Sequence, residues 1–173
     1  MHYVEIIQTH LDDIRVAWQW ASTAHGVALL QRALPVLGAF YALRGAHGEA
    51  EERFQETLAQ LGEEDEALRG QLLAQLGACL ERQGKIEASQ SALENAIAIA
   101  HRYKDYQTIG FAHVALARLL VSKGNISSAI EYLRSRLAAL PEGDFLTIRA
   151  ELLLYLGIAE GRQMHHDAAA AAL

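Results

Sequence analysis

The stretch LGAFYALRGAHGEAEERF, residues 37–54, carries a glycine inside a segment whose other residues favour helix. Glycine at such a position costs about 1 kcal/mol relative to alanine. The arrangement returns in LGACLERQGKIEASQSAL (76–93), LARLLVSKGNISSAIEYL (116–133) and LGIAEGRQMHHDAAAAAL (156–173). The small residue after the leading leucine recurs at steps of 39, 40 and 40 residues, as Gly38, Gly77, Ala117 and Gly157. A repeat of this period predicts a stack of similar structural units.

Each unit contains the signals for two helices. Seven residues after the small position stands a glycine, which suits the left-handed backbone that ends a helix; in the fourth unit methionine replaces it. A second small position follows twelve residues after the first, at Ala50, Ser89 and Ala129. Small residues on both helices let the two backbones of a pair approach closely. The recurring glycine is therefore interpreted as a helix-contact position.

The predicted map is a leading helix followed by four helix pairs. The pairs are 27–44 with 47–61, 65–83 with 86–102, 105–122 with 126–139, and 144–162 with 165–173. The leading helix covers about 3–22, so residues 1–26 are predicted to join an upstream domain and 27–173 to form a solenoid with a truncated last repeat. Asp65, Asp105 and Asp144 are expected near the starts of first helices, because aspartate is a good N-cap.

Composition limits the classes of function. The 173-residue chain is 51% hydrophobic and carries a formal net charge of −6. An acidic chain without clustered Lys and Arg is not expected to contact nucleic acid directly. No membrane contact and no signal peptide are predicted, and the single cysteine, Cys79, suits a reducing compartment. We therefore expect a cytoplasmic location.

No motif in the sequence indicates catalysis or a cofactor. A phosphate-binding loop, an H-E-x-x-H pair and paired Cys/His spacings are all missing, so no catalytic, cofactor or metal residue is assigned. The adjacent His165 and His166 point about 100° apart on a helix, and His113 is interpreted as a packed histidine. The chain is predicted not to be an enzyme.

The repeat resembles the tetratricopeptide repeat (TPR), most closely in the first unit through Leu37, Gly38, Tyr41, Ala50 and Phe54. The resemblance implies an all-α fold, a right-handed α-α superhelix of about four helix pairs preceded by one extra helix. It weakens in the fourth unit, and the period of 39–40 residues exceeds the usual 34.

A second resemblance involves the leading segment HLDDIRVAWQWA, residues 10–21. It is similar to segments that open the helical repeats of bacterial STAND-class signalling ATPases, many of them transcriptional regulators. The matching residues are Asp12, Asp13, Ile14, Arg15, Ala17, Trp18, Trp20 and Ala21. In that family the repeats act as a sensor or protein-binding arm beside an ATPase domain, and Pro35 departs from the family's pattern.

Two functions stay open at this point. The first is a non-catalytic sensor or interaction domain of a larger signalling or transcriptional regulator, which binds a protein, peptide or small effector in the concave groove. The alternative is a free-standing TPR adaptor or scaffold. The candidate groove residues are Arg32, Gln71, Gln75, Arg82, Phe111, Arg118, Glu151, Tyr155 and Arg162, with an acidic or C-terminal peptide centred on Arg82, Phe111 and Arg118.

Two further surfaces are predicted at the ends of the array. Residues 168–173 give an apolar half-repeat, so self-association through the truncated C-terminal repeat is expected. In the leading helix, Leu11, Ile14 and Trp18 should cover the first pair. Val16 and Trp20 form a second stripe, interpreted as facing a separate upstream domain.

Overall fold

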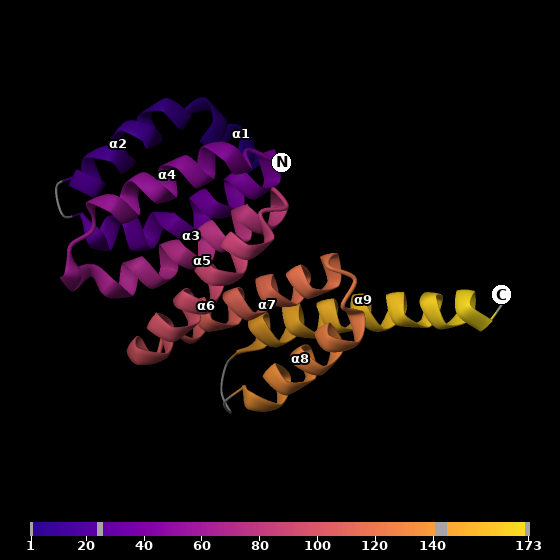
Figure 1. Ribbon diagram of the computed structural model, residues 1–173. Coiled ribbons are helices and arrows are strands. Elements are labelled where there is room, and N and C mark those ends of the chain that lie inside the picture. Colours follow the sequence, from indigo (N-terminus) through magenta and orange to yellow (C-terminus); the bar gives the residue numbers. More distant parts are fainter. Residues whose placement is uncertain (1, 24–25, 141–144, 172–173) are drawn as a thin grey trace.

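The protein is a stack of antiparallel helices (Figure 1). The computed structural model describes residues 2–23, 26–140 and 145–171, with the side chains of 5–23, 26–140 and 145–164. Within these ranges every regular element is a helix. They are α1 His2–Thr9, α2 Leu11–Thr23, α3 Val27–Arg44, α4 His47–Gln60, the short 3-10 turn η1 Glu63–Asp65, α5 Glu66–Arg82, α6 Ile86–Tyr103, α7 Tyr106–Ser122, α8 Ile126–Ala139 and α9 Leu146–Ala171. The predicted all-α class and the first three helix pairs, α3–α4, α5–α6 and α7–α8, are confirmed.

Glycine ends the first helix of each of these three pairs. Gly45, Gly84 and Gly124 have φ angles of 66°, 73° and 78°. This left-handed region is open to glycine and strained for most other residues. The turn therefore follows the glycine, and the second helix begins two residues later at His47, Ile86 and Ile126.

The fourth unit departs from the predicted pair. Met164 takes the place of the glycine, and α9 runs without a break to Ala171. Methionine favours the helical conformation, so nothing stops the helix at this residue. The predicted second helix over 165–173 is therefore wrong for 165–171, and 172–173 lie outside the described residues. Figure 1 shows the yellow end of α9 extending beyond the rest of the stack.

The leading segment also differs from its prediction. It forms two helices, α1 and α2, which meet at His10, in place of one helix over 3–22. α2 packs on the first pair through Trp18, whose side chain is 4% exposed. The Trp18 Nε1–H donates a hydrogen bond to Thr57 Oγ1 at 2.8 Å. An ion pair of 2.7 Å between Arg15 and Glu49 holds the other end of this contact.

The recurring small residues serve different contacts along the chain. At Gly77 an added Cβ would lie 2.5 Å from Leu93 Cγ on the paired helix α6. Ser89 Oγ also donates a hydrogen bond to the Gly77 carbonyl at 2.8 Å, so these two backbones do approach closely. At Gly38 an added Cβ would instead meet the Gln75 side chain of α5, at 2.2 Å from Oε1. The nearest neighbour of Gly38 is therefore on α5 of the next pair, and not on its own partner helix α4 as predicted.

The other small positions complete this comparison. Ala50, Ala117 and Ala129 are each 0% exposed, as the repeat pattern predicts for contacts between helices. Gly157 is exposed, and a Cβ there would have no atom within 4 Å. The reason is the unbroken α9, because no second helix of a fourth pair packs against it in the described part of the chain.

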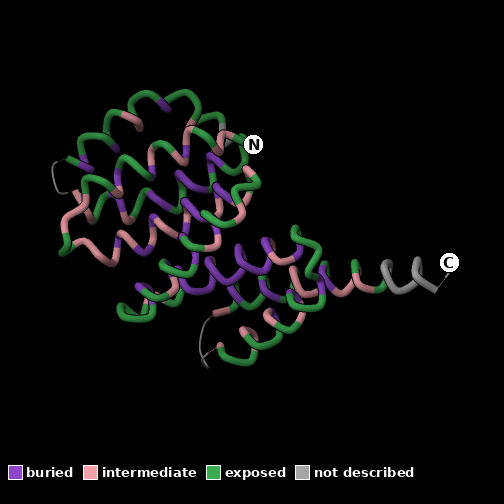
Figure 2. Tube along the Cα trace, in the orientation of Figure 1, coloured by how far each residue is buried: buried purple, intermediate pink, exposed green. Residues whose placement is uncertain are grey.

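The core forms three clusters in sequence order. The first joins α2 to α5 around Tyr41 and Phe54, the second joins α5 to α7 around Leu93, and the third joins α7 to α9 around Leu133. Figure 2 shows the buried residues following the inner faces of the stacked helices. Each unit is thus stabilised mainly by its neighbours, as in other repeat arrays.

One described helix, α3, has the length and apolar content of a membrane span. Its 18 residues have a mean hydropathy of 1.2. The core helix of a globular domain passes the same test, and α3 contributes Leu30, Leu34, Phe40 and Tyr41 to the first core cluster. The absence of a membrane contact therefore stays a prediction.

Candidate peptide-binding groove

Three adjoining cavities run along the first helices of the pairs. They have volumes of about 270, 250 and 260 Å³. The first and second share Pro35, Gln75 and Phe111, and the second and third share Arg82 and Arg118. We call this continuous depression, formed by α3, α5, α7 and α9, the groove.

The groove contains seven of the nine predicted binding residues. They are Gln71, Gln75, Arg82, Phe111, Arg118, Tyr155 and Arg162. Arg32 and Glu151 line none of the three cavities. The α3 positions that do are Gln31, Leu34, Pro35, Gly38, Ala39 and Ala42, a stripe with helical spacing. Arg32 is rotated by about 100° from Gln31 and is exposed outside the groove.

One end of the groove is lined by amides. Gln31, Gln71, Gln75 and Gln107 come from three different helices and surround the first cavity. Gln71 Nε2 donates to Asp105 Oδ2 at 2.9 Å, and Asp105 also caps α7 by accepting from the Thr108 backbone N–H. An amide side chain both donates and accepts hydrogen bonds, so this end matches the N–H and C=O groups of an extended peptide.

The charge of Asp105 is part of this amide end. Burial by itself raises the pKa of the carboxyl group, but hydrogen bonds from Gln71 and Thr108 together outweigh it. The pKa of Asp105 consequently lies below its ordinary value. The predicted capping role is confirmed for Asp105. Asp65 precedes α5 without capping it through its side chain, and Asp144 lies outside the described residues.

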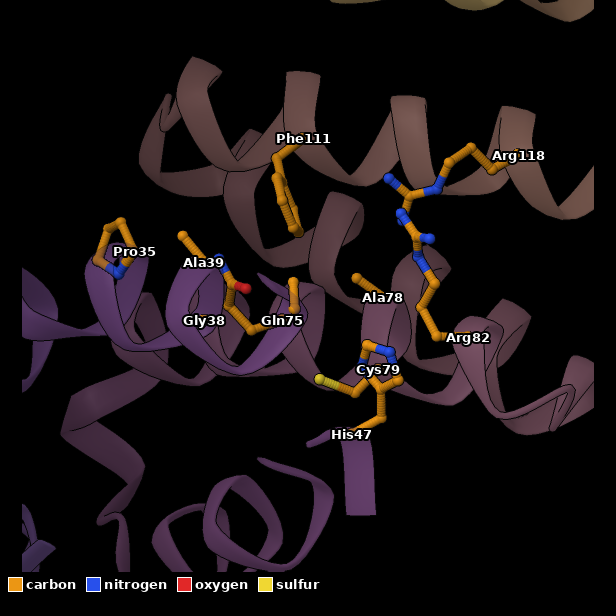
Figure 3. Close-up of a pocket in the computed structure, with 11 residues that line it drawn as sticks. Pro35, Gly38, Ala39, His47, Gln75, Ala78, Cys79, Arg82, Phe111 and Arg118 are labelled. Atoms are coloured by element: carbon orange, nitrogen blue, oxygen red, sulfur yellow. The ribbon is translucent and has the colours of Figure 1, made fainter. Parts of the chain in front are cut away.

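The middle of the groove is apolar and shallow. Phe111 faces Pro35 and the small residues Ala39 and Ala78, as Figure 3 shows. Cys79 also lines this cavity and is 7% exposed. Burial, with a smaller effect of the Glu51 charge, raises the pKa of the Cys79 thiol to about 11. The thiol is therefore protonated at neutral pH and acts as a small apolar surface.

Arginines gather at the other end, around a single carboxylate. Arg118 contacts Glu81 with 3.0 Å between Nη2 and Oε2, and its guanidinium lies 5.7 Å from the centre of the Tyr155 ring. The nearest contact of Arg82 with the same oxygen is 3.7 Å, and the Arg82 side chain is 50% exposed. Figure 3 shows the two guanidinium groups side by side above the cavity.

Arg162 adds a third cation at this end, in the cavity that also contains Glu81, Arg82 and Arg118. The lining of this cavity therefore carries three guanidinium groups and one carboxylate. Glu81 fixes the orientation of Arg118, which leaves the exposed face of Arg82 open to a ligand. A planar guanidinium of this kind holds a carboxylate through two parallel hydrogen bonds.

Sequence reasoning did not find Gln31, Gln107 and Glu81. Gln31 and Gln107 lie on different helices and belong to the site only because α3 and α7 lie beside α5. For Glu81, a signal was present, because it directly precedes Arg82 at the end of a first helix. Ion pairing across helices, such as Glu81 with Arg118, is set by the packing of neighbouring units and has no fixed spacing in the sequence.

The described residues contain no group of three or more His, Cys, Asp or Glu side chains arranged to hold a metal ion. His165 and His166 lie outside the residues whose side chains are described. His113 is packed, as predicted, at 8% exposure.

Comparison with known families supports the interpretation of the repeats. Residues 68–142 match the family described as Tetratricopeptide repeat, so this part of the chain is a TPR region. It spans α5 to α8 and provides the middle of the groove. Comparisons with curated proteins and with solved structures found no match. TPR domains are generally protein-interaction modules that bind proteins or peptides and are typically non-catalytic.

Proposed function

We propose that this protein binds an extended segment of a partner protein in the groove. The amides of Gln31, Gln75 and Gln107 hold the peptide backbone, and Phe111 receives an apolar side chain. The arginine end receives an acidic side chain or a C-terminal carboxylate. The groove thereby gives the peptide a direction, with its anionic end toward α9.

The observation that carries this proposal is the unequal charge at the arginine end. Two guanidinium groups share one carboxylate, and the more exposed of them, Arg82, contacts it only at 3.7 Å. The chain as a whole has a net charge of −6, so a local excess of positive charge in a concave site is not explained by composition. Arginine and tyrosine, both present at this end of the groove, are among the residue types enriched in energetically important interface positions.

The wider setting is a further part of the proposal. The likeness of residues 10–21 to STAND-class proteins supports a sensor or interaction domain within a larger signalling or transcriptional regulator. The runner-up is a free-standing TPR adaptor. The full reading frame separates these two proposals. A phosphate-loop domain upstream would support the regulator, and the absence of such a domain would support the adaptor. Under either proposal the protein is cytoplasmic, is not an enzyme and needs no cofactor.

A displayed library of random peptides with free C-terminal carboxylates tests the groove directly. We expect the enriched peptides to carry acidic residues at or near the C-terminus, and their amidated forms to bind more weakly. Arg82→Ala should reduce affinity by about tenfold, because a hydrogen bond to a charged group contributes about 1.5–3 kcal/mol. Arg118→Ala should reduce it at least as much, with circular dichroism used to confirm that the fold is retained.

Arg44→Ala is the matched control. Arg44 is exposed at the end of α3 and lines none of the groove cavities, and its replacement removes the same charge. The Arg44→Ala variant should bind the enriched peptides with the affinity of the wild type. Wild-type affinity in Arg82→Ala and Arg118→Ala, with both variants folded, would place the binding surface elsewhere on the array.

A further inference from the structure

A fourth cavity lies outside the groove, where the end of α6 and the end of α8 meet the starts of α7 and α9. Its volume is about 280 Å³, near the lower end of the range for small-molecule sites. It shares no lining residue with the groove. It is lined by His101, Tyr106, Ile109, Gly110, His113, Arg136, Ala139, Leu140, Ile148 and Leu152.

The floor of this cavity is apolar and rigid. Ile109, Ile148 and Leu152 are 8%, 4% and 1% exposed. Gly110 lies between them, and an added Cβ would approach Ile148 Cγ2 to 2.5 Å. The glycine lets α9 lie close against α7 here, so the floor is built by tight packing of the two helices.

One wall offers a buried hydrogen-bond donor. His113 Nδ1 and the Tyr132 hydroxyl are 2.6 Å apart. Burial, with the nearby charges of Arg136 and His101, lowers the pKa of His113 to about 4, while burial raises the pKa of Tyr132 to about 12. At neutral pH both groups are therefore uncharged. In the tautomer in which the hydroxyl donates to Nδ1, the imidazole proton is on Nε2.

The Nε2–H group of His113 has no partner among the described residues. Within them, Arg53 Nε is the only fully enclosed polar side-chain atom that lacks a hydrogen bond. Nε2 is therefore not fully enclosed, and His113 is one of the residues that line this cavity. A donor on a residue that is 92% buried is thus available to a bound molecule.

The second wall is positively charged. The Arg136 guanidinium lies over the Tyr132 ring at 5.5 Å, and Nε donates to Ser135 Oγ at 3.3 Å. Among the described residues no carboxylate forms an ion pair with Arg136, and none of the described residues that line the cavity is acidic. His101 also lines the cavity. In a chain with a net charge of −6, this gives a cavity with a cationic wall and no carboxylate among its described lining residues.

We propose that this cavity binds a small organic carboxylate with an apolar body. The carboxylate accepts hydrogen bonds from the Arg136 guanidinium and from His113 Nε2–H, and the apolar body lies on Ile109, Ile148 and Leu152. Such a molecule would contact α7, α8 and α9 together and stabilise the end of the array against unfolding. This site is independent of the proposed peptide groove.

The test uses phenylacetate and hexanoate as probes, each with its neutral amide as a matched control. Titrations followed by two-dimensional amide NMR should show binding of at least one carboxylate, with a Kd of about 1 mM or tighter. The perturbed signals should include Ile109, His113 and Ile148. Each amide should bind at least about tenfold more weakly, since a charge-assisted hydrogen bond is roughly twice as strong as a neutral one.

Arg136→Gln should reduce carboxylate binding to the level of the amide. Arg134→Gln is the control, because Arg134 lies one half-turn away on α8 and is paired with Glu160 at 2.7 Å. That variant should bind as the wild type does. Both substitutions are at partly or fully exposed side chains, so both variants should fold. Three results would overturn the proposal: a carboxylate and its amide bind equally well, Arg136→Gln binds the carboxylate as well as the wild type does, or neither carboxylate binds.

Discussion

Gly77 and Gly157 occupy the same position of the repeat but differ in what surrounds them. A Cβ at Gly77 would lie 2.5 Å from Leu93 Cγ, whereas a Cβ at Gly157 would have nothing within 4 Å. The same residue type therefore has a structural role in the second unit and none within the described part of the fourth. Substitutions at the two glycines therefore separate two effects on the free energy of unfolding, the loss from overpacking at Gly77 and the gain from higher helix propensity at Gly157.

We expect Gly77→Leu to lower the free energy of unfolding by about 1–3 kcal/mol through overpacking. Gly157→Ala should raise it by up to about 1 kcal/mol, because alanine is the better helix former and meets no neighbour. Urea denaturation followed by circular dichroism measures both. A stabilised Gly77→Leu variant would contradict the close contact between α5 and α6.

His113 should make stability depend on pH. Its pKa is lowered from 6.5 to about 4 by burial and by the charges of Arg136 and His101. The unfolded state therefore binds a proton at a higher pH than the folded state. The contribution of neutral His113 to the free energy of unfolding should be fully present above about pH 6.5. It should fall by about 3 kcal/mol between pH 6.5 and 4, and this group should cause no further change below pH 4.

The measurement is urea unfolding at several pH values for the wild type and for His113→Gln, which cannot titrate. The difference between the two free energies of unfolding should shrink as the pH falls through this window. Parallel curves for the two proteins would show that His113 is not buried in its neutral form.

At the scale of elements, α2 presents one buried face and one exposed face to its surroundings. Trp18 is 4% exposed and bonded to Thr57, whereas Trp20 is 60% exposed and Val16 is 71% exposed. The predicted stripe of Leu11, Ile14 and Trp18 does contact the first pair. The second stripe is uncovered in this structure, and its contact with an upstream domain stays a prediction.

The two tryptophans can be tested as a pair. Trp18→Ala should lower the free energy of unfolding by about 3–5 kcal/mol, because it leaves a cavity and an unpaired Thr57 hydroxyl. Trp20→Ala should change it by no more than about 0.5 kcal/mol. Thermal and urea unfolding of both variants decide this, and equal losses would mean that α2 packs differently.

Most helices could be predicted because the repeat marks both their ends. Gly45, Gly84 and Gly124 set the turns, and the predicted limits of α3 to α8 agree with the structure to within a few residues. The prediction of a fourth pair was wrong because it assumed the two-helix pattern of the earlier units. In the fourth unit Met164 replaces the glycine that ends the first helix in those units. No proline or glycine lies at the break between α1 and α2 at His10, so the sequence did not predict it, and we have no physical account of it.

The candidate groove was predictable in part, for a related reason. The spacing of first helices predicts which faces share a groove, and Arg82, Phe111 and Arg118 do line one cavity, while their role in binding stays a prediction. Arg32 falls outside because it lies on a different face of α3 from Gln31, Pro35 and Ala39, which line the cavities. The contact of Gly38 with Gln75 depends on the packing of successive units, which no single repeat contains.

At the scale of the whole molecule, one side of α9 is apolar and uncovered. Leu153, Leu154 and Met164 are 51%, 60% and 73% exposed, and Gly157 lies among them. The equivalent positions in the first two units are covered, Gly77 by Leu93 of α6 and Gly38 by Gln75 of α5. Because exposed apolar surface of this kind favours association, we propose that two copies of the chain meet through α9.

Static light scattering over a range of concentrations should show a monomer–dimer equilibrium. Leu153→Glu should shift it toward the monomer, because it buries a charge in the proposed contact. Leu43→Glu is the matched control, since Leu43 is 73% exposed on α3, far along the chain from α9. A wild-type protein that stays monomeric throughout would rule the contact out, as would equal effects of the two substitutions.

The three core clusters also bear on how the array stretches. Neighbouring clusters share a helix, α5 between the first and the second and α7 between the second and the third. Leu73 and Tyr132 also each pack against two clusters. Tension applied along the array would therefore act where these shared helices join one cluster to the next, while each cluster stays intact. The solenoid should lengthen elastically by small rotations between units, and the curvature of the groove, with the spacing of its two ends, should follow the load.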